Sequence, residues 1–170
     1  MSPFRPDIVD CWMFRIGHTS RAVERPEVLL IRRAPGRILP GLWQCVSGSL
    51  EPGERIAVGA LREVAEETGY DTRTIEAFFD LDQVNQFHEP SVDAVVTAAV
   101  FAARVRPGVE PVLSHEHDAA RWVPIADAAA DAVIWPGYRV AIATIARDVL
   151  DPDRASWFEL TLEGRRARTR

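Results

Sequence analysis

The feature that most constrains this chain is an acidic helix predicted over residues 55–68 and ended by Gly69. At 100° per residue, its small and apolar residues share one side, where they can pack against a sheet: Ala57, Ala60, Leu61, Val64 and Thr68. Glu63, Glu66 and Glu67 project from another side at spacing i, i+3, i+4, so their carboxylates are expected to be neighbours.

Three neighbouring carboxylates are unfavourable on their own. Like charges at these spacings cost a few tenths of a kcal/mol per pair, and Arg55 and Arg62 relieve only part of that cost. A divalent cation would relieve more, and Mg²⁺ typically binds one or two carboxylates together with substrate phosphates. The alternative is that this helix face is merely solvated, as most Glu-rich faces are.

The residues around the helix favour the metal site. Gly48 ends a predicted strand, where its backbone carbonyl could face the ion. The Pro52-Gly53 turn directs Glu54 toward the same place, and Arg62 could hold the carboxylate of Glu63 in position.

This segment resembles the Nudix box. Gly48 is followed after five residues by Glu54, and after seven more by the run from Arg62 to Tyr70, REVAEETGY. Every fixed position of the motif is present, and Tyr70 is the one soft departure, because an aliphatic residue is usual there. A looser likeness in the order of strands and helices runs over residues 8–150.

The resemblance implies an α+β fold, a Nudix-type α/β/α sandwich with a central mixed β-sheet and the box as a loop–helix–loop. The hydrophobic pattern agrees, because it predicts strands over 8–16, 28–33, 42–46, 75–84, 92–105 and 121–125, and helices over 126–133 and 138–150. Length predicts a single domain over residues 1–170, with a core over about 8–150. The arginine-rich segment 163–170 is predicted to be a frayed tail.

The resemblance also implies an activity: a pyrophosphohydrolase that acts on a phosphorus-containing acid anhydride, here a diphosphate linkage in a nucleoside-diphosphate-linked or nucleotide-like small molecule. Glu66 and Glu67 would be the main ligands of Mg²⁺, for which Mn²⁺ can substitute. The Gly48 carbonyl and Glu63 would lie nearby, Glu54 would complete the acidic site, and Arg62 would orient Glu63. Metal ions can neutralise phosphate charge, and a carboxylate can activate the attacking water.

The identity of the general base stays open between Glu63 and Glu116. Some members of the family use a glutamate of the box, and others use one on a later loop, where this chain has Glu116. His115 and His117 flank Glu116, and without a third nitrogen or sulfur ligand they are interpreted as surface loop residues rather than a zinc site.

Two arginines end the predicted strand over 28–33, and in similar family members an arginine there reaches the substrate phosphates. Arg33 is the better match and Arg32 the second, although an ordinary strand-end role is an alternative for both. The stretch from Leu42 to Glu51 is more similar to the dihydroneopterin triphosphate pyrophosphatase branch than to the mutagenic-nucleotide branch.

Composition limits the partners. A net charge of −5 argues against binding of a nucleic acid polymer, whose phosphates require a basic face. Cys11 and Cys45 are expected to be buried thiols. No apolar run is long enough to span a membrane, which makes a cytoplasmic location the expectation, and family members are often homodimers.

A binding module is the competing function class: a Nudix fold that senses a nucleotide without cutting it. A sensor would be expected to have lost some of the box glutamates. Glu63, Glu66 and Glu67 are all present here, which favours the enzyme.

Overall fold

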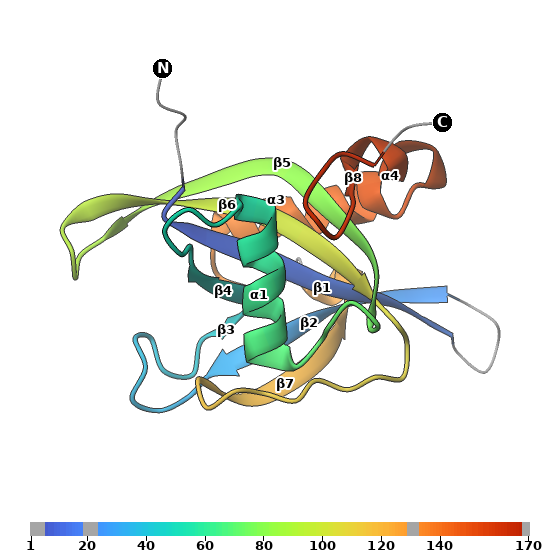
Figure 1. The fold of residues 1–170 in the computed structure, drawn as a ribbon. Coiled ribbons are helices and arrows are strands. Elements are labelled where there is room, and N and C mark those ends of the chain that lie inside the picture. The colour runs from blue at the N-terminus through green and yellow to red at the C-terminus, as the bar shows by residue number, and fades with distance from the viewer. Residues whose placement is uncertain (1–5, 19–23, 129–132, 168–170) are drawn as a thin grey trace, which may run out of the picture.

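The computed structural model describes residues 6–18, 24–128 and 133–167. An eight-stranded sheet has the path β3-β2-β1-β6-β5-β8, with β4 paired to β1 and β7 paired to β2 (Figure 1). The strands β1 and β6 are parallel, whereas the other pairs are antiparallel, so the predicted mixed sheet is confirmed.

The strands are β1 (Ile8–His18), β2 (Glu24–Arg33), β3 (Trp43–Gln44), β4 (Val46–Ser49), β5 (Ile75–Glu89), β6 (Ala94–Val105), β7 (His117–Pro124) and β8 (Glu159–Leu160). The segment predicted as one strand over 42–46 is two short strands, which pair with different neighbours, β2 and β1. The predicted contact between the strands near 75–84 and 92–105 is confirmed, because β5 and β6 form a long antiparallel pair.

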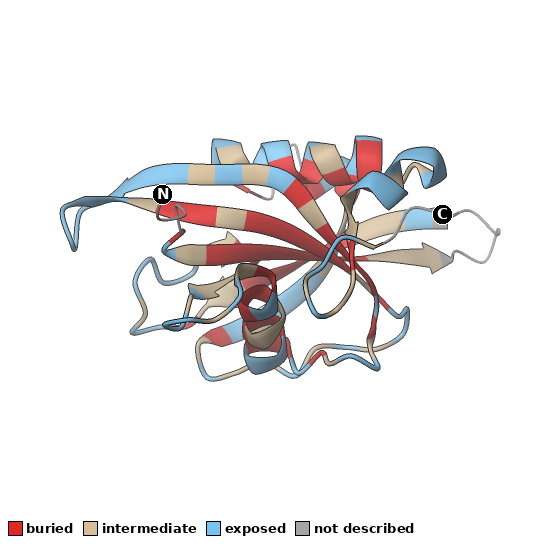
Figure 2. Cartoon of the chain, turned by 45° about the horizontal axis from the view of Figure 1, so that its top comes forward, coloured by how far each residue is buried: buried red, intermediate tan, exposed pale blue. Residues whose placement is uncertain are grey.

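Successive side chains of a strand point to opposite sides of the sheet. Both sides are covered by a core cluster, so the central strands are buried on both faces. In β1, Val9, Cys11 and Met13 join a core cluster with helix α1 (Ile56–Thr68), while Trp12 and Phe14 join the cluster on the opposite face. Figure 2 shows buried strands between two helical layers. Both cysteines are buried free thiols, as expected.

The second face is covered by α3 (Pro136–Thr144), which continues as a π-helical turn, η2 (Ile145–Val149). Ala141, Ile142 and Ile145 are fully buried against the sheet, which confirms the helix predicted over 138–150. Of the helix predicted over 126–133, the structure has the short α2 (Ile125–Asp127), and residues 129–132 lie outside the described residues. No helix in the described ranges is long and apolar enough to cross a membrane.

The prediction of a frayed tail over 163–170 is wrong for the residues up to 167. After α4 (Pro152–Phe158) and β8, the chain turns back at Gly164, whose carbonyl accepts a hydrogen bond from Arg55 at 3.0 Å. Arg166 donates to the carbonyl of Trp157 at 2.8 Å and pairs with Asp80 at 3.6 Å. Arg166, one of the arginines that suggested a solvated end, therefore helps to fasten this segment to the domain. Residues 168–170 lie outside the described residues.

One carboxylate lies inside the sheet. Asp10 of β1 is 4% exposed and accepts hydrogen bonds from Ser47 on β4 and from Asn85 on β5, the latter at 3.5 Å. Burial raises the pKa of Asp10 to about 6, from an ordinary value of 3.8, and the two hydrogen bonds only partly oppose that rise.

The raised pKa of Asp10 predicts a pH-dependent stability. As pH rises from 3.8 to about 6, the unfolded chain loses this proton while the folded chain keeps it. The contribution of Asp10 to the free energy of unfolding therefore falls by about 1.4 kcal/mol per pH unit, on the order of 3 kcal/mol in all. The variant Asp10→Asn cannot ionise, so its stability relative to wild type should increase across this window and then level off. Urea unfolding at a series of pH values measures this difference, and a difference that does not change with pH would refute the assignment.

Candidate active site

Arg62, on the face of α1 that carries the glutamates, organises the local charges. Its guanidinium donates to Glu54 at 2.9 Å, to Glu63 at 2.8 Å, to Glu66 at 3.2 Å and to the carbonyl of Ser49 at 2.9 Å. These acceptors, Glu54 first, hold the pKa of Arg62 well above its usual range. Arg62 therefore fixes the helix to the end of β4 as well as orienting Glu63.

Glu63 is buried where α1 crosses β4. A Cβ built on Gly48 would lie 2.0 Å from Cδ of Glu63, so no larger residue fits at position 48 while that carboxylate keeps its place. Burial raises the pKa of Glu63, and the hydrogen bond and charge of Arg62 oppose that rise. The glycine that opens the box is thus needed for close approach of a carboxylate to the backbone.

Glu67 is the more deeply buried of the two, with 6% of its side chain exposed. The backbone N–H of Ser47 donates to its carboxylate, but Oε2 has no hydrogen-bond partner. Burial raises the pKa of Glu67 to about 8, and the charges of Glu63 and Glu116 add to the effect. A buried carboxylate oxygen without a donor is costly unless a cation or another donor reaches it.

The three glutamates of the helix do not form one cluster. Glu66 has 58% of its side chain exposed and is held by Arg62, because its position turns it toward solvent and away from β4. Glu54 is bound to Arg62 and accepts a hydrogen bond from the backbone N–H of Glu51 at 3.0 Å. Arg55, expected to balance these carboxylates, instead binds the C-terminal turn at Gly164.

The loop between β6 and β7 brings Glu116 to the same region. Glu116 pairs with Arg37 at 3.0 Å, and its charge is felt by both Glu63 and Glu67. Its backbone carbonyl accepts a hydrogen bond from Ala34 at 2.9 Å. This late glutamate and the box are therefore brought together by the fold.

The two candidate substrate arginines differ in position. Arg33 donates to Oε1 of Gln44 at 3.4 Å and to the carbonyl of Ile38, and its charge lowers the pKa of Glu67. Arg32 is paired with Asp118 at 2.7 Å and lies over the ring of Trp43, 5.6 Å from its centroid. Successive strand residues point to opposite faces, so Arg33 is the one that faces the carboxylates.

The structure contradicts the interpretation of His117 as a surface loop residue. His115 is exposed and contacts Arg37, but only 2% of the His117 side chain is exposed. Its Nε2 lies 4.0 Å from Oε2 of Glu67, and neither ring nitrogen has a hydrogen-bond partner. The stretch from Ser114 to Asp118 shows no periodicity, so the burial of His117, the first residue of β7, could not be inferred from its neighbours.

The donor set suits a hard cation that keeps other ligands of its own. Among the described residues, no group of three or more His, Cys, Asp or Glu side chains is arranged so that it could hold a metal ion. Two buried carboxylates, Glu63 and Glu67, one with an unpartnered oxygen, match the one or two protein carboxylates that Mg²⁺ takes alongside water and phosphate.

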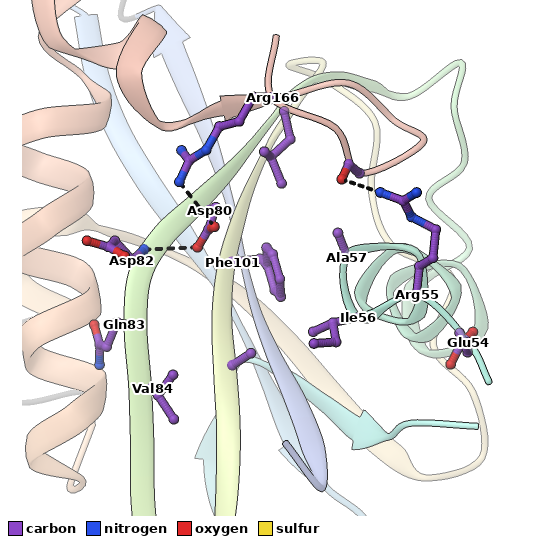
Figure 3. A pocket seen from close by; sticks show the side chains of 13 residues that line it. Glu54, Arg55, Ile56, Ala57, Asp80, Asp82, Gln83, Val84, Phe101 and Arg166 are labelled. Carbon is purple, nitrogen blue, oxygen red and sulfur yellow. Dashed lines mark hydrogen bonds and ion pairs between the residues drawn. The ribbon is translucent and has the colours of Figure 1, made fainter. Parts of the chain in front are cut away.

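A separate groove of about 710 Å³ lies between the first turn of α1, the strands β5 and β6, and the C-terminal turn. In Figure 3, Phe101 and Ile56 lie between the Arg166–Asp80 pair and Arg55. Glu54 reaches its rim, but Glu63 and Glu67 are not among the described residues that line it. The buried carboxylates and this groove are therefore distinct features of the α1 face.

Comparison with known proteins agrees with this arrangement. The sequence profile of the NUDIX domain matches residues 14–144. Nudix hydrolase 6 of Arabidopsis thaliana is 31% identical over 102 residues, which cover 58% of this chain and 34% of that protein. A Myxococcus xanthus protein named octanoyltransferase is 40% identical over 100 residues, 58% of this chain and 26% of that protein. The chain thus spans about a quarter to a third of the length of these curated relatives.

The fold has counterparts among solved structures. The structure of the E. coli dihydroneopterin triphosphate pyrophosphohydrolase superposes with a TM-score of 0.61 at 26% identity, over 79% of this chain and 91% of that chain. The profile match includes the whole box, from Gly48 to Tyr70, with the helix and buried glutamates described above. This chain belongs to the Nudix family.

Proposed function

We propose that this chain is a divalent-metal-dependent pyrophosphohydrolase, which cleaves a diphosphate linkage in a nucleoside-diphosphate-linked or nucleotide-like small molecule. The observation that carries the proposal is the pair of buried carboxylates, Glu63 and Glu67, with Oε2 of Glu67 left without a donor. Buried anions of this kind cost stability, and a bound cation compensates for that cost.

Glu67 and Glu63 would hold the ion, with Glu66 and the Gly48 carbonyl as further oxygen donors at the edge of the site. A bound Mg²⁺ or Mn²⁺ would neutralise charge on the diphosphate. Arg62 holds Glu63 and Glu54 in fixed orientations. Arg33, whose charge lowers the pKa of Glu67, would meet a phosphate oxygen. Arg32 is a weaker candidate because Asp118 already occupies its guanidinium.

Glu116 is our preferred general base, and Glu63 is the alternative. The side chain of Glu116 is 43% exposed and lies on a loop, so it can meet both a water molecule and an incoming substrate. Both carboxylates are paired with an arginine, but the side chain of Glu63 is only 11% exposed, which favours a fixed role as a ligand over proton transfer.

The proposed substrate class is a pterin triphosphate. The flank from Leu42 to Glu51 and the 26% identity to the E. coli dihydroneopterin triphosphate pyrophosphohydrolase both support this choice. A screen with Mg²⁺ should compare dihydroneopterin triphosphate, nucleoside triphosphates, dinucleoside polyphosphates and nucleotide sugars. A cytoplasmic location and a homodimer stay predictions.

A nucleotide-sensing module is the second candidate, and the family fold alone is compatible with it. The buried pair Glu63 and Glu67 favours hydrolysis, because a module that only binds has no need for costly buried carboxylates. Nucleotide binding without any metal-dependent release of product would favour the sensor.

The variant Glu67→Gln is expected to abolish turnover, a loss of at least about 10²-fold in kcat, while the fold stays intact. The amide keeps the shape of the side chain but removes the charge that would hold the ion. Product release with Mg²⁺ measures the effect, and circular dichroism reports the fold. The matched control is Glu76→Gln on β5, outside the box, which should retain wild-type turnover. Equal turnover by wild type and Glu67→Gln would count against the proposal.

The variants Glu116→Gln and Glu63→Gln separate the two candidate bases. If Glu116 is the base, Glu116→Gln should lower kcat by about 10²-fold or more and leave metal affinity close to wild type. Glu63→Gln should weaken metal binding as well, because Glu63 would be a ligand. Rate measurements and metal titrations on both variants test this, and the reverse pattern would assign the base to Glu63.

A further inference from the structure

We propose that His117 is a positioning residue for Glu67: its Nε2–H holds Oε2 of that carboxylate and so sets its orientation toward the bound cation. This inference rests on the proposed function, because it assigns a role to Glu67 as a metal ligand. It adds a residue that the box motif does not include.

The first support is the pairing of two buried atoms that both lack a partner. Oε2 of Glu67 accepts no hydrogen bond, and Nε2 of His117 makes none. A neutral imidazole offers one N–H, and a carboxylate oxygen is the acceptor that such a donor requires. Since buried polar groups are nearly always hydrogen-bonded, an interaction between these two atoms would satisfy both of them.

The second support is distance. Nε2 and Oε2 are 4.0 Å apart, beyond the usual 2.7–3.2 Å of a direct hydrogen bond. Closing that gap requires a movement of about 1 Å, which a small change in side-chain torsion supplies. Both side chains are almost fully buried, 2% and 6% exposed, so solvent does not compete for either atom.

The third support is the way the backbone holds the two residues together. The N–H of Ser114 donates to the carbonyl of Glu67 itself at 3.2 Å, and the N–H of His117 donates to the carbonyl of Ser114 at 3.2 Å. One residue further along α1, the carbonyl of Thr68 accepts a hydrogen bond from the backbone N–H of Val112 at 2.9 Å. The loop that leads into His117, the first residue of β7, is thus fastened to the same helical turn that carries Glu67.

Residues that orient a metal ligand typically change metal affinity by about 10- to 100-fold when they are replaced. Two variants of His117 separate a positioning role from a role in packing. Gln places an amide N–H near the position of Nε2, whereas Asn places its amide near Nδ1 and cannot reach Glu67. Both variants are polar and similar in size, so both should fold equally well, which thermal unfolding checks.

The affinity of the metal-free protein for Mn²⁺ is measured by isothermal titration calorimetry. The value of kcat is the second readout. His117→Asn should weaken Mn²⁺ binding by about 10-fold or more, and His117→Gln should stay within about threefold of wild type. The control variant is His115→Asn, which replaces the exposed histidine two positions earlier. This variant should bind Mn²⁺ with wild-type affinity. In a Glu67→Gln background, His117→Asn should cause no further loss, because its partner is already altered.

Each alternative outcome is decisive. Wild-type affinity in His117→Asn would overturn the inference and leave the proposed function standing. An equal loss in His117→Asn and His117→Gln would also overturn it, because the imidazole would then be a direct metal ligand or a packing element. Wild-type protein that binds no Mn²⁺ would overturn both this inference and the proposed function.

Discussion

The burial of two carboxylates between α1 and the sheet is the constraint on which the rest of this structure depends. Glu63 and Glu67 lie on the side of α1 that turns toward β4, next to the apolar residues that fix the helix to the sheet. Removing charged groups from water costs several kcal/mol per ion unless they are compensated. Arg62 supplies part of that compensation, and Gly48 leaves the space that the carboxylate of Glu63 occupies.

Arg62 and Gly48 make the burial of Glu63 possible in different ways. Arg62 neutralises Glu63, binds Glu54 and Glu66, and anchors the helix through the carbonyl of Ser49. Gly48 contributes only its lack of a side chain, which lets the carboxylate of Glu63 lie against the backbone of β4. Neither contribution reaches Oε2 of Glu67, so this oxygen is where the site is open to a cation and to His117.

The site joins segments that are distant in sequence. The box supplies Glu63 and Glu67, and the end of β2 supplies Arg33. The β6–β7 loop supplies Glu116, and the first residue of β7 is His117. The pairing of β2 with β7 places Arg33 opposite His117, and hydrogen bonds from the loop to α1 complete the arrangement. The groove near the C-terminal turn lies outside this set, although it shares the α1 face.

The sequence by itself determined the α+β class, the long strands and the helix of the box, because their hydrophobic periods are strong and local. It also singled out Glu63, Glu67, Arg62 and Gly48 as candidate site residues, because the spacing of the motif is specific. Tertiary structure decided which two of the three helical glutamates are buried, since a period of 3.6 residues fixes relative angles but not the direction of the sheet. It also decided that Arg33 faces the carboxylates, that His117 is buried while His115 is exposed, and that the arginine-rich segment is bound as far as residue 167. These outcomes depend on contacts between residues far apart in the chain, and no local pattern encodes such contacts.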